Sequence, residues 1–284
     1  MKLMDCHTHT QFSVDSEADI NECVRRAAEL ELAAYAITDH CECNAWYGRE
    51  HYSEAEQQVR ESFDYASDFE RSVSAVTAMK EKYAGKLNLI CGVELGQILH
   101  DTDAAKTVNA DNRVDFIIGS VHQVLGEQDF YFIDYEKLTM DEIYDLLERY
   151  FREVYDLSRT DLFDVVGHIT YCLRYMKQRH GICADISRFD DMIGETFRNL
   201  AQNGKGIEIN TSGLRQGFGD CFPDLKYVKL FRDLGGEIIT IGSDSHTVED
   251  IAANAADGAE LARAAGFRRL AYFRKRKPYF TDIV

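Results

Sequence analysis

The sequence predicts an α/β barrel in which parallel strands alternate with helices. Two observations lead to this prediction. Seven short apolar segments are separated by stretches with helical periodicity, and each segment ends in a histidine, a carboxylate or a polar cluster. Segments such as 116–119 and 238–241 are almost continuously apolar, which is typical of parallel strands buried on both faces. Because a barrel gathers the carboxyl ends of its strands into one ring, we expect these polar residues to form a single site.

The apolar segments place the strands, and capping signals place the helices between them. Strands are expected at about 2–7, 34–39, 87–94, 114–121, 164–169, 206–210 and 237–242. Three capping-box patterns predict helices that end near residues 30, 83 and 156, namely Ser16 with Asp19, Ser53 with Glu56, and Thr139 with Glu142. Further helices are expected at 187–203, 223–234 and 248–265, with Gly204, Gly235 and Gly266 as their stops.

Charge and hydropathy limit the classes of protein to consider. The chain of 284 residues has a formal net charge of −17, which disfavours a broad nucleic-acid interface because such interfaces are basic. No stretch approaches the roughly 18 consecutive apolar residues of a membrane span, and the N-terminus has no signal-peptide pattern. We expect a cytoplasmic protein without a membrane or nucleic-acid partner, forming a single domain over 1–284 with a helical insert at about 53–83. The sequence leaves the oligomeric state open.

The cysteines and the basic C-terminal segment each allow two interpretations. The 8 cysteines form no CxxC pair, so we expect reduced core or loop thiols. Cys41 and Cys43 follow His40 closely enough for metal binding to be an alternative. The basic segment 268–277 is expected to be a solvated terminal face, with a phosphate or partner patch as the alternative.

His7-Thr8-His9 is the sharpest local signal for a metal site. Alternate residues of a strand point to the same face, so the two imidazoles can converge on one ion. Asp244-Ser245-His246 repeats this spacing far along the chain. Imidazole and carboxylate ligands together suit Zn²⁺, Mn²⁺ or Fe²⁺. A single such pair is compatible with ordinary surface or core histidines, but further candidate ligands at other strand ends favour a metal centre.

The chain resembles the PHP (polymerase and histidinol phosphatase) family of metal-dependent phosphoesterases. The motifs that carry the resemblance are Asp5-Cys6-His7-Thr8-His9, Thr38-Asp39-His40, Gly92-Val93-Glu94, Ser120-Val121-His122, Gly167-His168 and Gly242-Ser243-Asp244-Ser245-His246. They extend over nearly the whole chain. The resemblance implies a distorted (β/α)7 TIM-like barrel, the PHP fold, that holds two or three divalent metal ions (Zn, Mn or Fe) at the carboxyl ends of its strands.

The resemblance also implies a division of the metal ligands into three sets. The expected sets are His7, His9, Glu94 and Asp244; a bridging Glu94 with His122 and His168; and Asp15, His40 and His246. Aspartate at position 15 replaces a histidine found in many relatives, and a simple turn residue is the alternative there. Asp5 and Asp39 suit an orienting role, in which a carboxylate holds the second nitrogen of a ligating imidazole.

Two arginines in strand-end loops are candidates for binding phosphate. Arg174 and Arg215 each offer a planar fork that matches a phosphate group, and the resemblance supports both as a clamp, with Ser212 as a further contact. Candidate acceptors for a substrate amine are Glu42, Glu17 and Asp15. The other histidines, expected to be solvated, are His51, His100 and His180, with contact to the site from the insert as the alternative for His51.

The expected function is hydrolysis of a phosphate monoester by a metal-bridging hydroxide, since bound ions lower the pKa of water. The resemblance points to L-histidinol phosphate, an intermediate of histidine biosynthesis, as the substrate. Residues expected to act in catalysis are Glu94, Asp244, His246 and Arg215, with His246 or a metal-bound water protonating the leaving group. The alternatives are a related enzyme acting on another small phosphate ester, nucleotide or phosphodiester, and a non-enzymatic metal-binding module.

Overall fold

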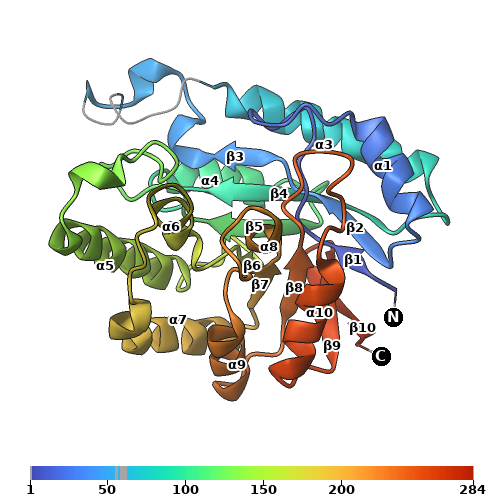
Figure 1. Cartoon of the computed structure of the whole chain (residues 1–284). Coiled ribbons are helices and arrows are strands. Elements are labelled where there is room, and N and C mark those ends of the chain that lie inside the picture. Colours follow the sequence, from blue (N-terminus) through green and yellow to red (C-terminus); the bar gives the residue numbers. More distant parts are fainter. Residues whose placement is uncertain (1, 55–56, 58–62, 284) are drawn as a thin grey trace.

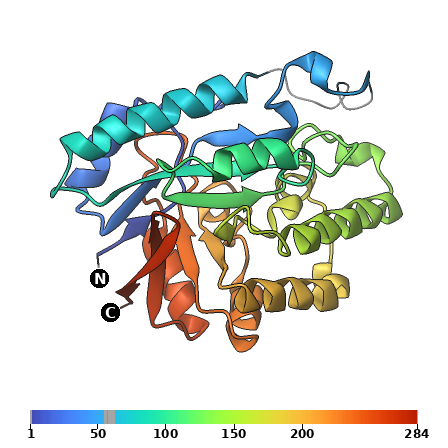
Figure 2. The same cartoon turned by 180° about the vertical axis from the view of Figure 1, so that it is seen from behind.

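The apolar segments form the parallel barrel that the sequence predicts. The structure, a computed structural model, describes residues 2–54, 57 and 63–283. Seven parallel strands follow the order β1-β2-β4-β5-β6-β7-β8, β3 pairs with β4 beyond the end of β2, and helices lie around the outside (Figures 1 and 2). The strands are β1 (Met4–Asp5), β2 (Ala34–Ile37), β3 (His40–Glu42), β4 (Leu89–Gly96), β5 (Phe116–Ser120), β6 (Val165–Val166), β7 (Gly206–Asn210) and β8 (Ile239–Gly242).

Backbone hydrogen bonds between the first and last strands nearly close the barrel. The Cys6 amide donates to the Ile241 carbonyl at 2.8 Å, and Thr8 and Ser245 form a parallel bridge just beyond the strand ends. The His7-Thr8-His9 and Asp244-Ser245-His246 segments therefore lie side by side, although they are separated by most of the chain. Closure of the barrel and assembly of the site thus depend on the same contacts.

The helices confirm the predicted alternation but correct several boundaries. They are α1 (Ile20–Glu29), α3 (Tyr65–Lys82), α4 (Thr102–Asn109), α5 (Met140–Leu157), α6 (Arg174–His180), α7 (Asp190–Gln202), α8 (Ser212–Arg215), α9 (Leu225–Asp233) and α10 (Ala255–Ala264), with 3₁₀ turns η1 (Cys43–Ala45), η2 (Arg49–His51), η3 (Tyr135–Lys137), η4 (Tyr171–Leu173) and η5 (Ile186–Phe189). The Thr139–Glu142 capping box is confirmed at the start of α5. The stops at Gly204, Gly235 and Gly266 are confirmed by positive φ angles just after α7, α9 and α10.

Two predicted helix starts are wrong, and one predicted helix is interrupted. Asp19, not Ser16, caps α1, because the Ser16 hydroxyl donates instead to the His246 carbonyl at 2.9 Å. The continuous helix expected over 53–83 is interrupted at residues 63–64, where Asp64 caps α3; part of the Ser53–Glu56 signal lies outside the described residues. Helix α10 starts at Ala255 rather than near Val248, after residues with positive φ.

The basic C-terminal segment is not the simple solvated face that was expected. It belongs to an antiparallel hairpin of β9 (Arg269–Arg274) and β10 (Lys277–Asp282) that packs at the amino end of the barrel. The ring of Phe273 stacks on Phe116 with centroids 4.9 Å apart, and Arg276 reaches Asp164 just before β6. The hairpin therefore covers the barrel end opposite the site.

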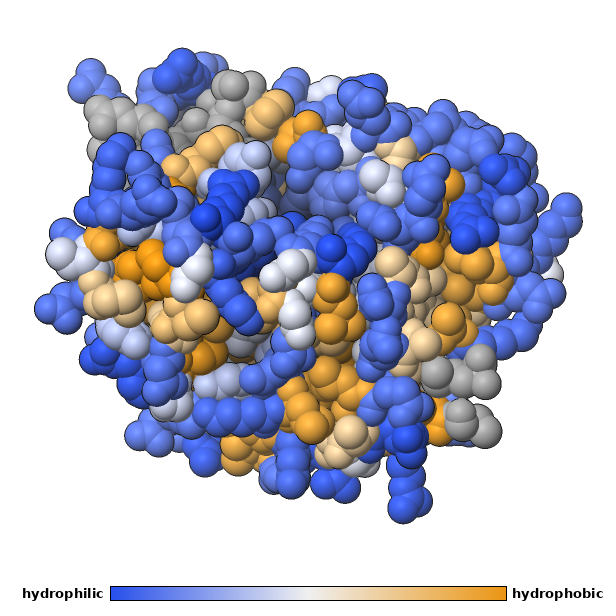
Figure 3. All heavy atoms as spheres, in the orientation of Figure 1, coloured by the Kyte–Doolittle hydropathy of each residue, from blue (hydrophilic) through white to orange (hydrophobic). Residues whose placement is uncertain are grey.

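The visible face of the molecular surface is mainly hydrophilic (Figure 3). In Figure 3 hydrophilic side chains dominate the face shown, and apolar side chains form separate patches. Within the described residues, no helix is both long enough and apolar enough to cross a membrane.

Candidate metal centre

The two paired segments bring their imidazoles and carboxylates to one point. The Nε2 atoms of His7 and His9 lie 3.1 Å apart, which confirms that the two rings converge. The Asp244 Oδ1 lies 3.3 Å from His9 Nε2 and 3.8 Å from His7 Nε2, while Glu94 Oε2 lies 3.2 Å from His7 Nε2. Ligands bound at about 2.1 Å to one zinc-like ion lie roughly 3.0–3.4 Å apart, so these spacings fit an ion.

Glu94 stands at the centre of this arrangement, near the carboxyl end of β4. Its Oε1 lies 3.0 Å from His122 Nε2 and 2.8 Å from His168 Nε2. Its Oε2 is buried, has no hydrogen-bond partner within the described chain, and lies 2.9 Å from His40 Nδ1. A buried carboxylate oxygen surrounded by imidazole nitrogens is the arrangement that a bridging metal ligand requires.

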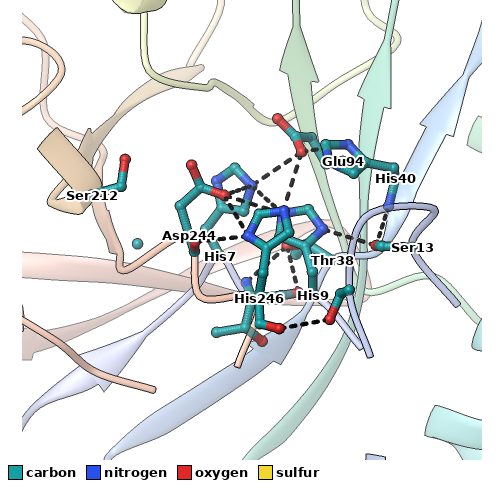
Figure 4. A network of polar contacts seen from close by, with 12 residues as sticks. His7, His9, Ser13, Thr38, His40, Glu94, Ser212, Asp244 and His246 are labelled. Carbon is teal, nitrogen blue, oxygen red and sulfur yellow. Dashed lines mark hydrogen bonds and ion pairs between the residues drawn. The ribbon is translucent and has the colours of Figure 1, made fainter. Parts of the chain in front are cut away.

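The third expected set also comes together, at the edge of the site. The Asp15 carboxylate lies 3.1 Å from His246 Nε2 and 3.6 Å from His40 Nε2. The His9 ring stacks against those of both His40 and His246, with centroids 4.3 and 4.2 Å away (Figure 4). Asp15 thus lies beside both imidazoles of its expected set.

Buried groups orient three of the imidazoles through their other nitrogens. The Glu208 carboxylate in β7 lies 2.6 Å from His7 Nδ1, and the Glu42 carboxylate in β3 lies 2.9 Å from His122 Nδ1. The Ser13 hydroxyl contacts His9 Nδ1 at 2.9 Å and donates to Asp39 (Figure 4). Such contacts fix the ring and its tautomer.

Asp5 and Asp39 were both expected to hold the second nitrogen of a ligating imidazole. For Asp39 this holds only indirectly, and for Asp5 it is wrong. Asp39 acts on His9 through Ser13, whereas Asp5 accepts from the Ser243 amide at 2.9 Å and the Ala252 amide at 2.8 Å. Asp5 thus holds the backbone that carries Asp244, instead of an imidazole.

Sequence reasoning missed Glu208, although one signal was available. A lone carboxylate inside the apolar strand 206–210 has no place unless its partner is also polar and buried. Gly242 supports the contact, because a Cβ there would meet Glu208 Oε1 at 2.2 Å and the His7 Cβ at 2.3 Å.

Burial and mutual charges set opposite pKa directions for these groups. Burial alone would raise the pKa of Glu94, but His7, His122 and His40 bring it well below its usual value. Burial would likewise raise the pKa of Asp244, and its imidazole neighbours lower it. Burial, together with the charges of His246 and His40, lowers the pKa of His9 to about 3. Anionic carboxylates beside a neutral imidazole are the protonation states in which these groups bind metal.

A cavity of about 490 Å³ opens from the metal centre. Its walls include Arg174 at the start of α6, Asp129 and a set of aromatic side chains, namely Phe63, Tyr65, Tyr131, Phe132, Tyr171 and Tyr175. The Arg174 Nε is buried without a hydrogen-bond partner among the described residues, and Nη1 lies 3.9 Å from Asp244 Oδ2. Arg174 therefore presents an unused donor beside the candidate metal ligand Asp244.

Arg215 and Ser212 are not brought to this cavity. The guanidinium of Arg215 donates to the carbonyls of Ser243 and Asp244 at 2.6 and 2.8 Å, and its Nε donates to Asp250 at 3.1 Å. The Ser212 hydroxyl donates to Asn210 Oδ1 at 2.6 Å and lies apart from the imidazoles in Figure 4. Arg215 thus supports the loop of Asp244, which has a φ of 55°.

The structure also places the candidate amine acceptors, the other histidines and the two cysteines near His40. Glu17 is exposed and is not among the residues that line the cavity, whereas Glu42 lines it but contacts His122 Nδ1 at 2.9 Å. The expectation of a solvated histidine holds for His51 but is wrong for His100, whose buried ring contacts Glu153 at 2.9 Å, and His180 is largely buried beside Glu136. Cys41 and Cys43 are buried, and burial raises the pKa of both thiols.

Fold and site together define a class of protein, a parallel barrel whose strand ends carry clusters of imidazoles and carboxylates that could hold metal ions. The PHP domain profile matches residues 5–212, and the chain belongs to this family. Its curated relatives include a probable histidinol-phosphatase of Clostridium acetobutylicum, 26% identical over 96% of this chain and 98% of the relative. Another is the histidinol-phosphatase of Lactococcus lactis, 27% identical over 96% of this chain and 95% of the relative.

Solved structures show the same fold. A histidinol phosphate phosphatase from Lactococcus lactis, crystallised with zinc, L-histidinol and phosphate, superposes with a TM-score of 0.78 at 22% identity, over 98% of this chain and 99% of that one. A putative histidinol phosphatase from Listeria monocytogenes gives a TM-score of 0.71 at 22% identity, over 89% of this chain and 99% of that one.

Proposed function

We propose that this protein is a metal-dependent histidinol-phosphatase that hydrolyses L-histidinol phosphate to L-histidinol and phosphate. The observation that carries the proposal is one cavity that combines the metal centre, the free Nε of Arg174 and an aromatic wall. The full-length similarity to proteins named histidinol-phosphatase supports the choice of substrate.

We assign two or three divalent ions, zinc, manganese or iron, to the centre. The proposed ligands are the nine residues His7, His9, Asp15, His40, Glu94, His122, His168, Asp244 and His246. Divalent ions supply a nucleophilic hydroxide from water near neutral pH and neutralise charge on the phosphoryl group. Glu94 holds the centre together, because its two oxygens face different imidazoles. No serine or cysteine nucleophile is needed.

Arg174 is proposed to bind the phosphate. Its side chain is held against the rings of Tyr171 and Tyr175, with Cζ 5.8 and 5.0 Å from their centroids, so the guanidinium is oriented before substrate arrives. A preoriented arginine beside the ions stabilises charge as it develops on the equatorial oxygens. We assign Arg215 a positioning role instead, because its contacts hold the carbonyls around Asp244.

The aromatic wall and Asp129 are proposed to receive the organic part of the substrate. Tyr131, Tyr171 and Tyr175 provide ring faces for an imidazole, and the Asp129 carboxylate provides a negative charge for an ammonium group. A water molecule in the cavity, or His246 in its wall, would give the departing alkoxide its proton. The polar and aromatic halves of the cavity thus suit the two ends of histidinol phosphate.

The test is phosphate release from L-histidinol phosphate by chelator-treated protein reloaded with Zn²⁺ or Mn²⁺. We expect kcat/KM at least a hundredfold above that for p-nitrophenyl phosphate, and dependence on added metal. A preference for another phosphomonoester or a phosphodiester would rule out L-histidinol phosphate as the substrate but would retain the proposed metal-dependent hydrolysis. Metal-loaded protein that hydrolyses no phosphate ester would instead support a binding module.

A further inference from the structure

A second cavity lies at the amino end of the barrel, opposite the metal centre. It has a volume of about 570 Å³ and lies between α3, the start of β4 and the β9–β10 hairpin. Four basic side chains line it, those of Lys80, Arg274, Lys275 and Lys277, with Asp115 as its acidic residue. This concentration of positive charge is opposite in sign to the net charge of −17.

Only part of this positive charge is neutralised by the protein. Asp115 forms an ion pair with Lys80, and its other oxygen accepts from the backbone amide of Lys275 at 3.0 Å. Within the described part of the chain, no ion pair joins Arg274, Lys275 or Lys277 to a carboxylate. Three basic residues around one hollow are therefore left without a carboxylate partner.

Arg274 is oriented rather than free to move. Its Nε and Nη2 donate to Asn88 Oδ1 at 2.9 and 2.6 Å, and its Cζ lies 6.0 and 5.9 Å from the ring centroids of Tyr272 and Tyr279. Those two rings stack on each other at 5.7 Å. The guanidinium is thus held at the cavity wall by contacts that leave its charge uncompensated.

In the hairpin turn, a lysine occupies a position whose backbone conformation does not favour lysine. Lys275 and Arg276 have φ angles of 49° and 61°, a pair typical of a two-residue turn that prefers Asn-Gly. Arg276 is explained by its contacts with Asp164 at 2.7 Å and Asn109 at 2.6 Å. The Lys275 side chain has no such contact with the described residues, so its charge at the cavity is not needed to dock the turn.

We propose that this cavity binds a small polyanion with two or three negative charges, carried by phosphate or carboxylate groups. The three uncompensated cations supply the attraction, and the volume is that of a small-molecule site. The ligand binds independently of the metal centre, because the lining residues of the two cavities do not overlap.

The test is calorimetric titration of zinc-loaded protein with two probes, propane-1,3-bisphosphonate and tricarballylate, which distinguish a phosphate ligand from a carboxylate ligand. We expect saturable binding that Lys277→Glu weakens at least tenfold. The matched control is Arg268→Glu, an exposed residue outside the cavity with the same change of charge, which should weaken binding less than threefold.

A second variant and a second measurement distinguish binding in this cavity from binding at the metal centre. Arg174→Ala changes only the catalytic cavity, so it should leave this binding intact. Amide NMR signals of Lys275 and Lys277 should shift with the same midpoint. Equal weakening by Lys277→Glu and Arg268→Glu, or binding that is lost in Arg174→Ala, would overturn the proposal.

Discussion

The two ends of the barrel use buried carboxylates in opposite ways. At the amino end, Asp115 pairs with Lys80 and Asp164 pairs with Arg276, so each carboxylate has a permanent cation from the same chain. At the carboxyl end, Glu94 is surrounded by imidazoles, which carry a charge only when protonated. A carboxylate paired with lysine or arginine supports the fold, whereas one facing imidazoles, which lose their protons when they bind an ion, is completed by an added cation.

The largest effect is expected from Glu94→Gln, which removes the shared oxygen ligand. We expect activity to fall by roughly a thousandfold, as when a preorganised charge-stabilising group is lost, and bound metal to fall with it. Metal analysis and kcat measure both. Asp115→Asn is the control at the amino end, and it should leave metal content unchanged. If both variants lost metal equally, the two ends would not differ as described.

The two arginines near Asp244 should separate binding from positioning. Arg174→Ala should raise KM by roughly ten- to a hundredfold with metal content intact, because a charge-assisted contact to phosphate is worth about 1.5–3 kcal/mol. Arg215→Ala should instead lower metal content and kcat, since its carbonyl contacts hold Asp244. Steady-state kinetics with metal analysis distinguishes them. The reverse pattern would return the phosphate clamp to Arg215.

Glu208→Gln tests whether orientation of His7 matters as much as ligation. Loss of the carboxylate at 2.6 Å from Nδ1 should weaken metal affinity by about 10- to 100-fold, because such partners fix the ring and raise its basicity. Competition with a chromogenic chelator measures the affinity. A neutral outcome would show that the barrel wall alone positions His7.

Arg276→Ala should affect stability and not catalysis. It leaves Asp164 without its cation and releases the hairpin turn, and we expect a loss of about 1–3 kcal/mol in the free energy of unfolding, below the range for fully buried pairs. Urea denaturation of the metal-loaded protein measures the loss. A fall in kcat at full metal occupancy would mean that the two ends are coupled.

The smallest effect is a change in the pH dependence of stability when metal is removed. Burial lowers the pKa of His7, His40 and His122, but neighbouring carboxylates raise it well above 6.5 overall. In metal-free protein, the contribution of these histidines to the stability of the fold is therefore complete below about pH 6.5. It is lost as pH rises through the raised pKa values.

Melting temperature should accordingly fall between pH 6.5 and 9 without metal, by roughly 2–4 °C for each kcal/mol lost. Zinc-loaded protein should show the opposite trend over that range, because protons no longer compete for the imidazoles. Parallel pH trends in the two forms would contradict the assignment of these histidines.

The sequence by itself determined the strand order, the helix alternation and nine polar residues that the fold gathers together. Apolar periodicity and the spacing of His7-Thr8-His9 are local properties, so they can be read without coordinates. It did not reveal the β9–β10 hairpin, because the basic residues of 268–277 outweigh the short apolar run at 270–273 as a strand signal.

Only the tertiary structure decided which polar groups act on which. Glu208 meets His7 because β7 and β1 lie on either side of β8, and Arg215 turns to the Asp244 loop rather than to the cavity. Such partners are far apart in the chain, and their choice depends on side-chain direction and distance after the barrel has closed. The sequence thus supplied the ligands, and closure of the barrel decided which groups orient them.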